Sequence, residues 1–150
     1  MGQIDFYQID QARLETVLLQ LIKKTLVAKK KALILCPMPA ANKIDDVLWN
    51  HEPELWIPHG VNDGKGAEHC HVWISSDMSA NQNHAEYLFL LQGSEPAQWS
   101  TFKRCFCLFD GKSSTQLQRA RDQWKEWHLL PDTQLGYYIQ NANGGWNKKV

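Results

Sequence analysis

A chain of 150 residues that is 43% hydrophobic and 21% charged has the composition of an ordinary globular protein, and it can bury one core without metals or disulfides. Its 16 Lys and Arg residues balance its 16 Asp and Glu residues, which excludes a strongly basic nucleic-acid-binding protein. We predict a single domain over residues 1–150, with its core in about 4–128.

The charges are unevenly distributed along the chain. Eight bases and four acids lie from Lys103 onward, whereas the part before it carries eight bases and twelve acids. Such a distribution can steer an acidic partner to one end of a molecule, but it is too weak to indicate binding of duplex DNA.

The cysteines and the N-terminus bear on the compartment. The four cysteines stand in apolar, strand-like runs: Cys36, Cys70, Cys105 and Cys107. The N-terminus lacks the pattern of a signal peptide, and no apolar run approaches about 18 residues. We expect a cytoplasmic protein with reduced thiols and no membrane contact.

The first third of the chain alternates strand and helix signals. Residues 4–9 are a β-prone run, and Asp10 after it is a possible helix N-cap. The next apolar residues recur with helical spacing: Leu14, Val17, Leu18, Leu21, Ile22 and Thr25. Residues 32–36 form a continuous apolar run, as in a strand covered on both faces, and residues 40–50 indicate a second helix.

The rest of the chain adds strands and one clear helix. Further strand candidates are residues 55–58, 70–75, 86–91 and 104–109. We expect a loop at 59–66, a helix from about Ser113 to His128, and a loosely packed C-terminal tail over 131–150. The alternation of strands and helices predicts an α/β fold with a sheet layered between helices.

No segment has the pattern of a nucleotide site. Gly60, Gly64 and Lys65 approach the spacing of a phosphate-binding loop, but the spacing is one residue short. Gly66 also stands where a Ser or Thr hydroxyl should hold magnesium, and the segment does not open a helix. We expect no nucleotide-binding loop and no cofactor.

The sequence also has to be considered for a metal site and for catalytic motifs. On a strand, His69 and His71 share one face and could chelate zinc, with His51, His59 or His84 as a third ligand. We prefer the alternative in which these histidines face solvent or an interface. No nucleophile elbow or HExxH motif is present, so no catalytic residue is predicted.

The segment RARDQWKEWH, residues 119–128, stands out within the last predicted helix. At helical spacing an apolar stripe is bordered by a row of cations. The stripe consists of Leu117, Ala120, Trp124 and Trp127, and the border of Arg121, Lys125 and His128. Either the helix only packs on a core, or Trp124 lies at the rim of a groove in which Arg121 and Lys125 bind carboxylates.

A second aromatic cluster lies in the middle of the chain. Trp49 ends a predicted helix, and Trp56 starts a short strand before Pro58. Since tryptophan is enriched at interfaces, these residues could dock another subunit. Alternatively, they pack beneath the 59–66 loop.

Four segments together carry a family resemblance: FYQID, ALILCPMPAANKIDDVLWNHEPELWIPHG, EYLFLL and ARDQWKEW. They resemble the chi subunit of bacterial DNA polymerase III, most specifically over residues 31–60. The resemblance implies a Rossmann-like three-layer α/β/α fold with a mostly parallel sheet. It also implies a non-catalytic accessory subunit of a DNA-directed DNA polymerase holoenzyme.

The resemblance further implies two protein partners, with DNA contacted only indirectly. One is the psi subunit of the clamp loader, so that the chain would be a monomer or a heterodimer with psi. The other is the acidic C-terminal tail of single-stranded DNA-binding protein (SSB). By position, the tail-binding residues would be Arg121, Trp124 and Lys125. We add Leu117 from the apolar stripe and His128 from its border to this predicted set. The psi-facing residues would be Trp49, Trp56, Ile57, Pro58 and His59.

We therefore expect a bridge between the clamp loader and SSB. One alternative is a small cytosolic metal-dependent enzyme that uses His69 and His71. Another is a structural subunit without a tail pocket, which burial of Trp124 out of reach of solvent would favour.

Overall fold

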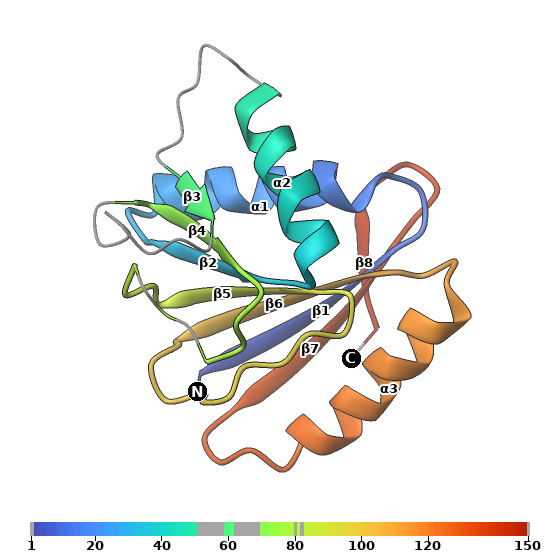
Figure 1. The fold of residues 1–150 in the computed structure, drawn as a ribbon. Coiled ribbons are helices and arrows are strands. Elements are labelled where there is room, and N and C mark those ends of the chain that lie inside the picture. Colours follow the sequence, from blue (N-terminus) through green and yellow to red (C-terminus); the bar gives the residue numbers. More distant parts are fainter. Residues whose placement is uncertain (1, 51–58, 62–69, 80, 82, 150) are drawn as a thin grey trace.

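Eight strands within the described part of the chain form one sheet in the order β3-β4-β2-β5-β6-β1-β7-β8 (Figure 1). The computed structural model describes residues 2–50, 59–61, 70–79, 81 and 83–149. The strands are β1 (Gln3–Ile9), β2 (Ala32–Leu35), β3 (His59–Val61), β4 (Val72–Ser75), β5 (Tyr87–Leu91), β6 (Arg104–Asp110), β7 (Gln134–Gln140) and β8 (Trp146–Lys148). Neighbouring strands are parallel except for β7 and β8, which are antiparallel.

Helices cover both faces of this sheet. Helices α1 (Leu14–Val27) and α2 (Met38–Asn50) lie on one face, and α3 (Ser114–Trp127) lies on the other (Figure 1). The prediction of a Rossmann-like α/β fold with a mostly parallel sheet is therefore confirmed. Among the described residues, no helix has both the length and the apolar character that crossing a bilayer requires.

The alternation of side chains along the strands divides the core in two. On β1, Ile4 and Phe6 pack with α3, whereas Tyr7 and Ile9 pack with α1 and α2. All four residues of β2 are buried, because both faces of this strand are covered. The continuous apolar run in the sequence thus reflects its place inside the sheet.

The prediction of a loosely packed tail over 131–150 is wrong. Strand β7 pairs with β1 along its length, so the C-terminal segment extends the sheet beside its N-terminal strand. The glycines that suggested a tail have local roles instead. Gly136 lies against Asp5, where a Cβ would come within 2.5 Å of the carboxylate, and Gly144 has a φ of +82° in the β7–β8 turn.

Two smaller predictions also need correction. Residues 59–61 form strand β3 and not a loop, whereas the predicted strand at 55–58 lies outside the described residues. Asp10 is not the N-cap of α1. That position is Arg13, which makes no side-chain capping bond.

Candidate functional site

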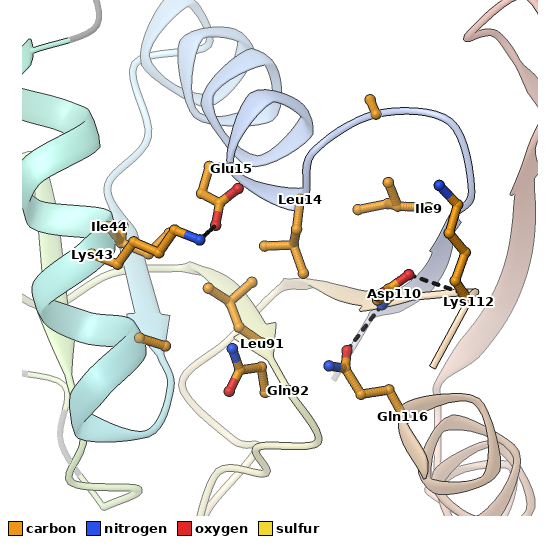
Figure 2. Close-up of a pocket in the computed structure, with 12 residues that line it drawn as sticks. Ile9, Leu14, Glu15, Lys43, Ile44, Leu91, Gln92, Asp110, Lys112 and Gln116 are labelled. Atoms are coloured by element: carbon orange, nitrogen blue, oxygen red, sulfur yellow. Dashed lines mark hydrogen bonds and ion pairs between the residues drawn. The ribbon is translucent and has the colours of Figure 1, made fainter. Parts of the chain in front are cut away.

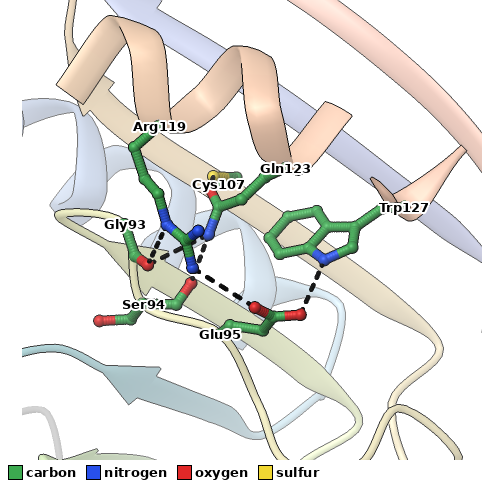
Figure 3. A network of polar contacts seen from close by, with 7 residues as sticks. All are labelled: Gly93, Ser94, Glu95, Cys107, Arg119, Gln123 and Trp127. Atoms are coloured by element: carbon green, nitrogen blue, oxygen red, sulfur yellow. Dashed lines mark hydrogen bonds and ion pairs between the residues drawn. The ribbon is translucent and has the colours of Figure 1, made fainter. Parts of the chain in front are cut away.

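One face of α3 is fixed to the sheet and to the loop after β5. Ala120, Gln123 and Trp127 are each at most 2% exposed. Trp127 Nε1 donates to Glu95 Oε1 at 3.1 Å, and Gln123 Nε2 donates to the backbone oxygens of Gly93 and Ser94 (Figure 3). Each buried polar group on this face therefore has a partner, which fixes the rotation of the helix about its axis.

Arg119 belongs to the same inward network. Its Nε donates to the Gly93 oxygen at 3.3 Å, and its guanidinium lies 3.4 Å from a carboxylate oxygen of Glu95 (Figure 3). A Cβ on Gly93, whose φ is +78°, would approach the Arg119 side chain to 2.8 Å. Arg119 therefore holds the 93–95 loop and points away from the opposite face of α3.

That opposite face forms one wall of a groove, which we call the α3 groove. It has a volume of about 590 Å³ and is lined by Gln8, Leu117, Gln118, Arg121, Trp124, Lys125, Tyr137, Ile139 and Lys149. The structure thus brings together four of the five predicted tail-binding residues, namely Leu117, Arg121, Trp124 and Lys125. Strands β1 and β7 and the residue after β8 supply the other wall.

His128, the fifth of those residues, does not line the groove. Its ring stacks on that of Trp124 from outside, with centroids 5.9 Å apart and planes inclined by 26°. His128 therefore lies next to the groove, and its contact with the tail stays a prediction.

The base of the groove is aromatic and rigidly supported. The ring of Trp124 meets that of Tyr137 edge to face, with centroids 5.9 Å apart. Phe6 lies behind both, 5.4 Å from Trp124 and 6.1 Å from Tyr137. Trp124 is half-buried, so it packs on the core and still presents one side to the groove. Packing of the helix on a core and a groove beside Trp124, the two interpretations drawn from the sequence, are thus compatible.

Tyr137 is held by its hydroxyl as well as by its ring. The hydroxyl donates to Gln8 Oε1 at 2.7 Å. Burial raises the pKa of Tyr137 to about 12, although the positive charge of Arg121 acts in the opposite direction. Tyr137 is consequently neutral at physiological pH and adds no negative charge to the groove.

The rim of the groove is cationic. Arg121 and Lys125 project from α3 and are exposed, and Lys149 Nζ lies 5.7 Å from the centroid of the Tyr137 ring. Within the described residues, none of these three cations forms an ion pair with a carboxylate. An aromatic base with such a rim suits a ligand that combines an aromatic side chain with carboxylates.

A second cavity lies where α/β proteins often bind nucleotides, outside the carboxyl ends of β1, β5 and β6 (Figure 2). It measures about 290 Å³, and an ion pair of 3.0 Å between Glu15 and Lys43 lies at its edge. Burial tends to raise the pKa of Glu15, but the hydrogen bond and charge of Lys43 outweigh it, so the pKa lies below its usual value. Glu15 thus keeps the negative charge that pairs with Lys43 at the edge of the cavity.

The backbone amides of the loop after β1 already have a hydrogen-bond acceptor within the protein. The side-chain oxygen of Gln140 accepts the backbone N–H groups of Asp10, Gln11 and Ala12 at 3.2, 2.8 and 3.1 Å. These are amides of the loop that binds phosphate in dinucleotide-binding folds. A nucleotide would have to displace Gln140 to reach them.

Most of the residues predicted to face psi are not among those that the structure describes. Trp56, Ile57 and Pro58 lie outside the described residues, as does the side chain of Trp49. The backbone of His59 begins β3, the strand at one edge of the sheet. The α3 groove lies toward the opposite edge, beside β7.

The metal-site alternative rests on two histidines, of which the structure describes one. His71 is exposed, and His69 lies outside the described residues. Among the residues that are described, no three His, Cys, Asp or Glu side chains are grouped closely enough to hold a metal ion. The shared face of His69 and His71 stays a prediction.

The chain matches a known protein family. Residues 1–130 match the family described as DNA polymerase III chi subunit, HolC. No curated protein matches the chain. The match includes all of α3 and ends before β7, so it leaves out Tyr137, Ile139 and Lys149 of the α3 groove.

Proposed function

Because the chain belongs to the DNA polymerase III chi subunit family, we propose that its α3 groove binds the acidic C-terminal tail of SSB. Membership of the family makes the chain an accessory subunit of DNA polymerase III. The proposal adds the ligand, the site that receives it and the residues that contact it.

A single observation carries the proposal. The aromatic pair Trp124 and Tyr137 forms the base of a groove whose rim holds Arg121, Lys125 and Lys149. Within the described part of the chain these cations have no carboxylate partner, so their charge is available to a ligand. A peptide with aspartates, a terminal aromatic side chain and a terminal carboxylate complements each of these features.

Each side chain has a distinct role in this proposal. The guanidinium of Arg121 binds the terminal carboxylate, because its planar fork can donate two parallel hydrogen bonds. The aromatic side chain of the tail packs beside Trp124 and Leu117. Lys125 attracts the aspartates as a mobile point charge.

The second contact that we propose is with the psi subunit of the clamp loader. We assign it to Trp49, Trp56, Ile57, Pro58 and His59, the last of which begins β3 at one edge of the sheet. In the strand order β3 is at one end, and β7 and β8 are at the other. Partners at opposite edges could bind together, which supports a bridge between the clamp loader and SSB.

The cations of the groove and the acidic groups of the tail determine how fast the bridge would form and how strongly salt would weaken it. Electrostatic attraction accelerates association and weakens as salt screens it. An SSB oligomer that presents several tails also raises the effective concentration once one tail is bound. A tail contact of modest affinity is therefore sufficient for the proposed function.

The test is fluorescence anisotropy of a labelled peptide with the tail sequence, titrated with the wild type and with Arg121→Ala at low and moderate salt. We expect salt-sensitive binding that Arg121→Ala weakens by about 1.5–3 kcal/mol, the usual contribution of a hydrogen bond to a charged group. No binding of the wild type at low salt would refute the proposal.

Arg119→Ala is the matched control for charge. It removes the same charge from the same helix, but Arg119 faces Gly93 and Glu95 and not the groove. Equal losses in the two variants would mean that only the net charge of the helix matters.

A further inference from the structure

The α3 groove depends on a part of the chain that lies beyond the family match. Tyr137, Ile139 and Lys149 line it, and all three follow residue 130, where the match ends. Three of the nine residues that line the groove therefore belong to the β7–β8 segment of this chain.

The hairpin is fixed in place by bonds at its turn. The Asn141 side-chain oxygen accepts the backbone N–H groups of Asn143 at 3.0 Å and of Gly145 at 2.9 Å. At the same end, Trp146 meets the ring of Tyr7 edge to face, with centroids 5.0 Å apart. These contacts set the path of β8 along β7, and so determine where the chain continues after Lys148.

Lys149 is positioned directly beside Tyr137. Its backbone N–H donates to the backbone oxygen of Tyr137 at 2.7 Å, and its ammonium group lies 5.7 Å from the centroid of the Tyr137 ring. Arg121, on the other wall, lines the same groove. Two cations from different elements thus line the groove whose base this ring helps to form.

We infer that Lys149 is a ligand-binding residue of the α3 groove and contacts a carboxylate of the acidic peptide from the side opposite α3. This inference rests on the proposed function, because it assigns a second contact to the same ligand. A peptide held only by α3 would have acidic groups paired on one side. With Lys149, cations face it from both walls.

The neighbouring lysine provides a matched control. Lys148 is also exposed and carries the same charge, but it is the last residue of β8 and does not line the groove. Lys148→Ala and Lys149→Ala therefore change the net charge equally, and they differ only in which side chain faces the ligand.

The experiment is the same anisotropy titration with the labelled acidic peptide, performed on the wild type, Lys149→Ala, Lys148→Ala and Lys149→Arg across a range of salt. We expect Lys149→Ala to weaken binding by about threefold to fivefold, as for a partly exposed ion pair, and to make it less salt-sensitive. Lys148→Ala should stay within about twofold, and Lys149→Arg should restore most of the affinity.

The outcomes separate this inference from the proposed function. If Lys149→Ala and Lys148→Ala bind alike while Arg121→Ala still loses affinity, the inference is wrong and the proposed function stands. If the wild type does not bind the peptide, both are wrong. Equal thermal unfolding midpoints of the two lysine variants would exclude a difference in folding as the cause.

Discussion

The side-chain oxygen of Gln140 accepts the backbone N–H of Gln11 at 2.8 Å and joins the end of β7 to the loop after β1 across 129 residues. The same oxygen accepts the N–H groups of Asp10 and Ala12. These amides precede α1, whose N-cap residue Arg13 provides no capping bond. One buried glutamine thus accepts three loop amides and attaches the C-terminal hairpin to the loop after the first strand.

Gln140→Ala should lower the free energy of unfolding by about 1–3 kcal/mol, because it leaves three backbone donors without their acceptor. Urea denaturation followed by circular dichroism would measure this loss. Gln134→Ala is the control, since that side chain lies exposed on the same strand and should cost less than about 0.5 kcal/mol. Equal stability of the two variants would contradict the role of Gln140.

Glu95→Ala should destabilise the packing of α3 on the sheet. It removes the acceptor of the Trp127 indole and the ion-pair partner of Arg119, so we expect a loss of about 1–3 kcal/mol. Glu95→Gln can still accept from the indole and should lose less. Urea titrations followed by tryptophan fluorescence would compare them, and an equal loss would show that only the charge of Glu95 contributes.

Stability should fall between about pH 10 and pH 12. Burial raises the pKa values of Tyr7 and Tyr137 from 10.0 to about 12, so the unfolded state loses its protons first. The stabilising contribution of each tyrosine is therefore complete below pH 10 and is lost as pH rises through the folded-state pKa. Urea denaturation at a series of alkaline pH values would measure this decrease.

Tyr137→Phe supplies the control for this pH dependence. It removes one of the two titrating hydroxyls, so stability should decline less steeply across the same interval. It also removes the bond to Gln8, which should cost about 0.5–1.5 kcal/mol at neutral pH. An unchanged slope would mean that Tyr137 titrates at its ordinary pKa.

Thiol reagents should distinguish the four cysteines. Burial raises the pKa values of Cys36 and Cys107 to about 12 and that of Cys105 well above 9.0, whereas Cys70 is only half-buried. We expect one fast-reacting thiol in the native protein at neutral pH and four after denaturation. Cys70→Ser should abolish the fast phase. Two fast thiols would contradict the burial of the other cysteines.

The periodic patterns in the sequence were sufficient for the elements that depend on local spacing. The apolar run of β2 and the helical stripes of α1 and α3 appear where they were predicted. On α3, the spacing of Trp124 and Trp127 correctly placed the first at a rim and the second in the core. Burial on a helix or strand follows from its own period, which a sequence displays directly.

The second wall of the α3 groove depends on pairings that no local pattern contains. The proline and glycines of segment 131–150 mark turns and so predict a tail, and nothing nearby in the sequence shows that β7 pairs with β1 more than 120 residues earlier. Gln8, Tyr137, Ile139 and Lys149 were missed for this reason. Conversely, His128 has the correct helical spacing but stacks outside the groove, since the position of β7 determines which part of the helix faces it.

The sequence by itself therefore determined the α/β fold class, the family and the α3 half of the groove. Each of these rests on patterns within single segments, which can be recognised without knowing how the segments pack. Only the tertiary structure decided that the C-terminal hairpin completes the groove, that Arg119 faces the 93–95 loop, and that Gln140 occupies the loop after β1. These relationships arise from strand order and register, which depend on contacts between residues far apart in the sequence.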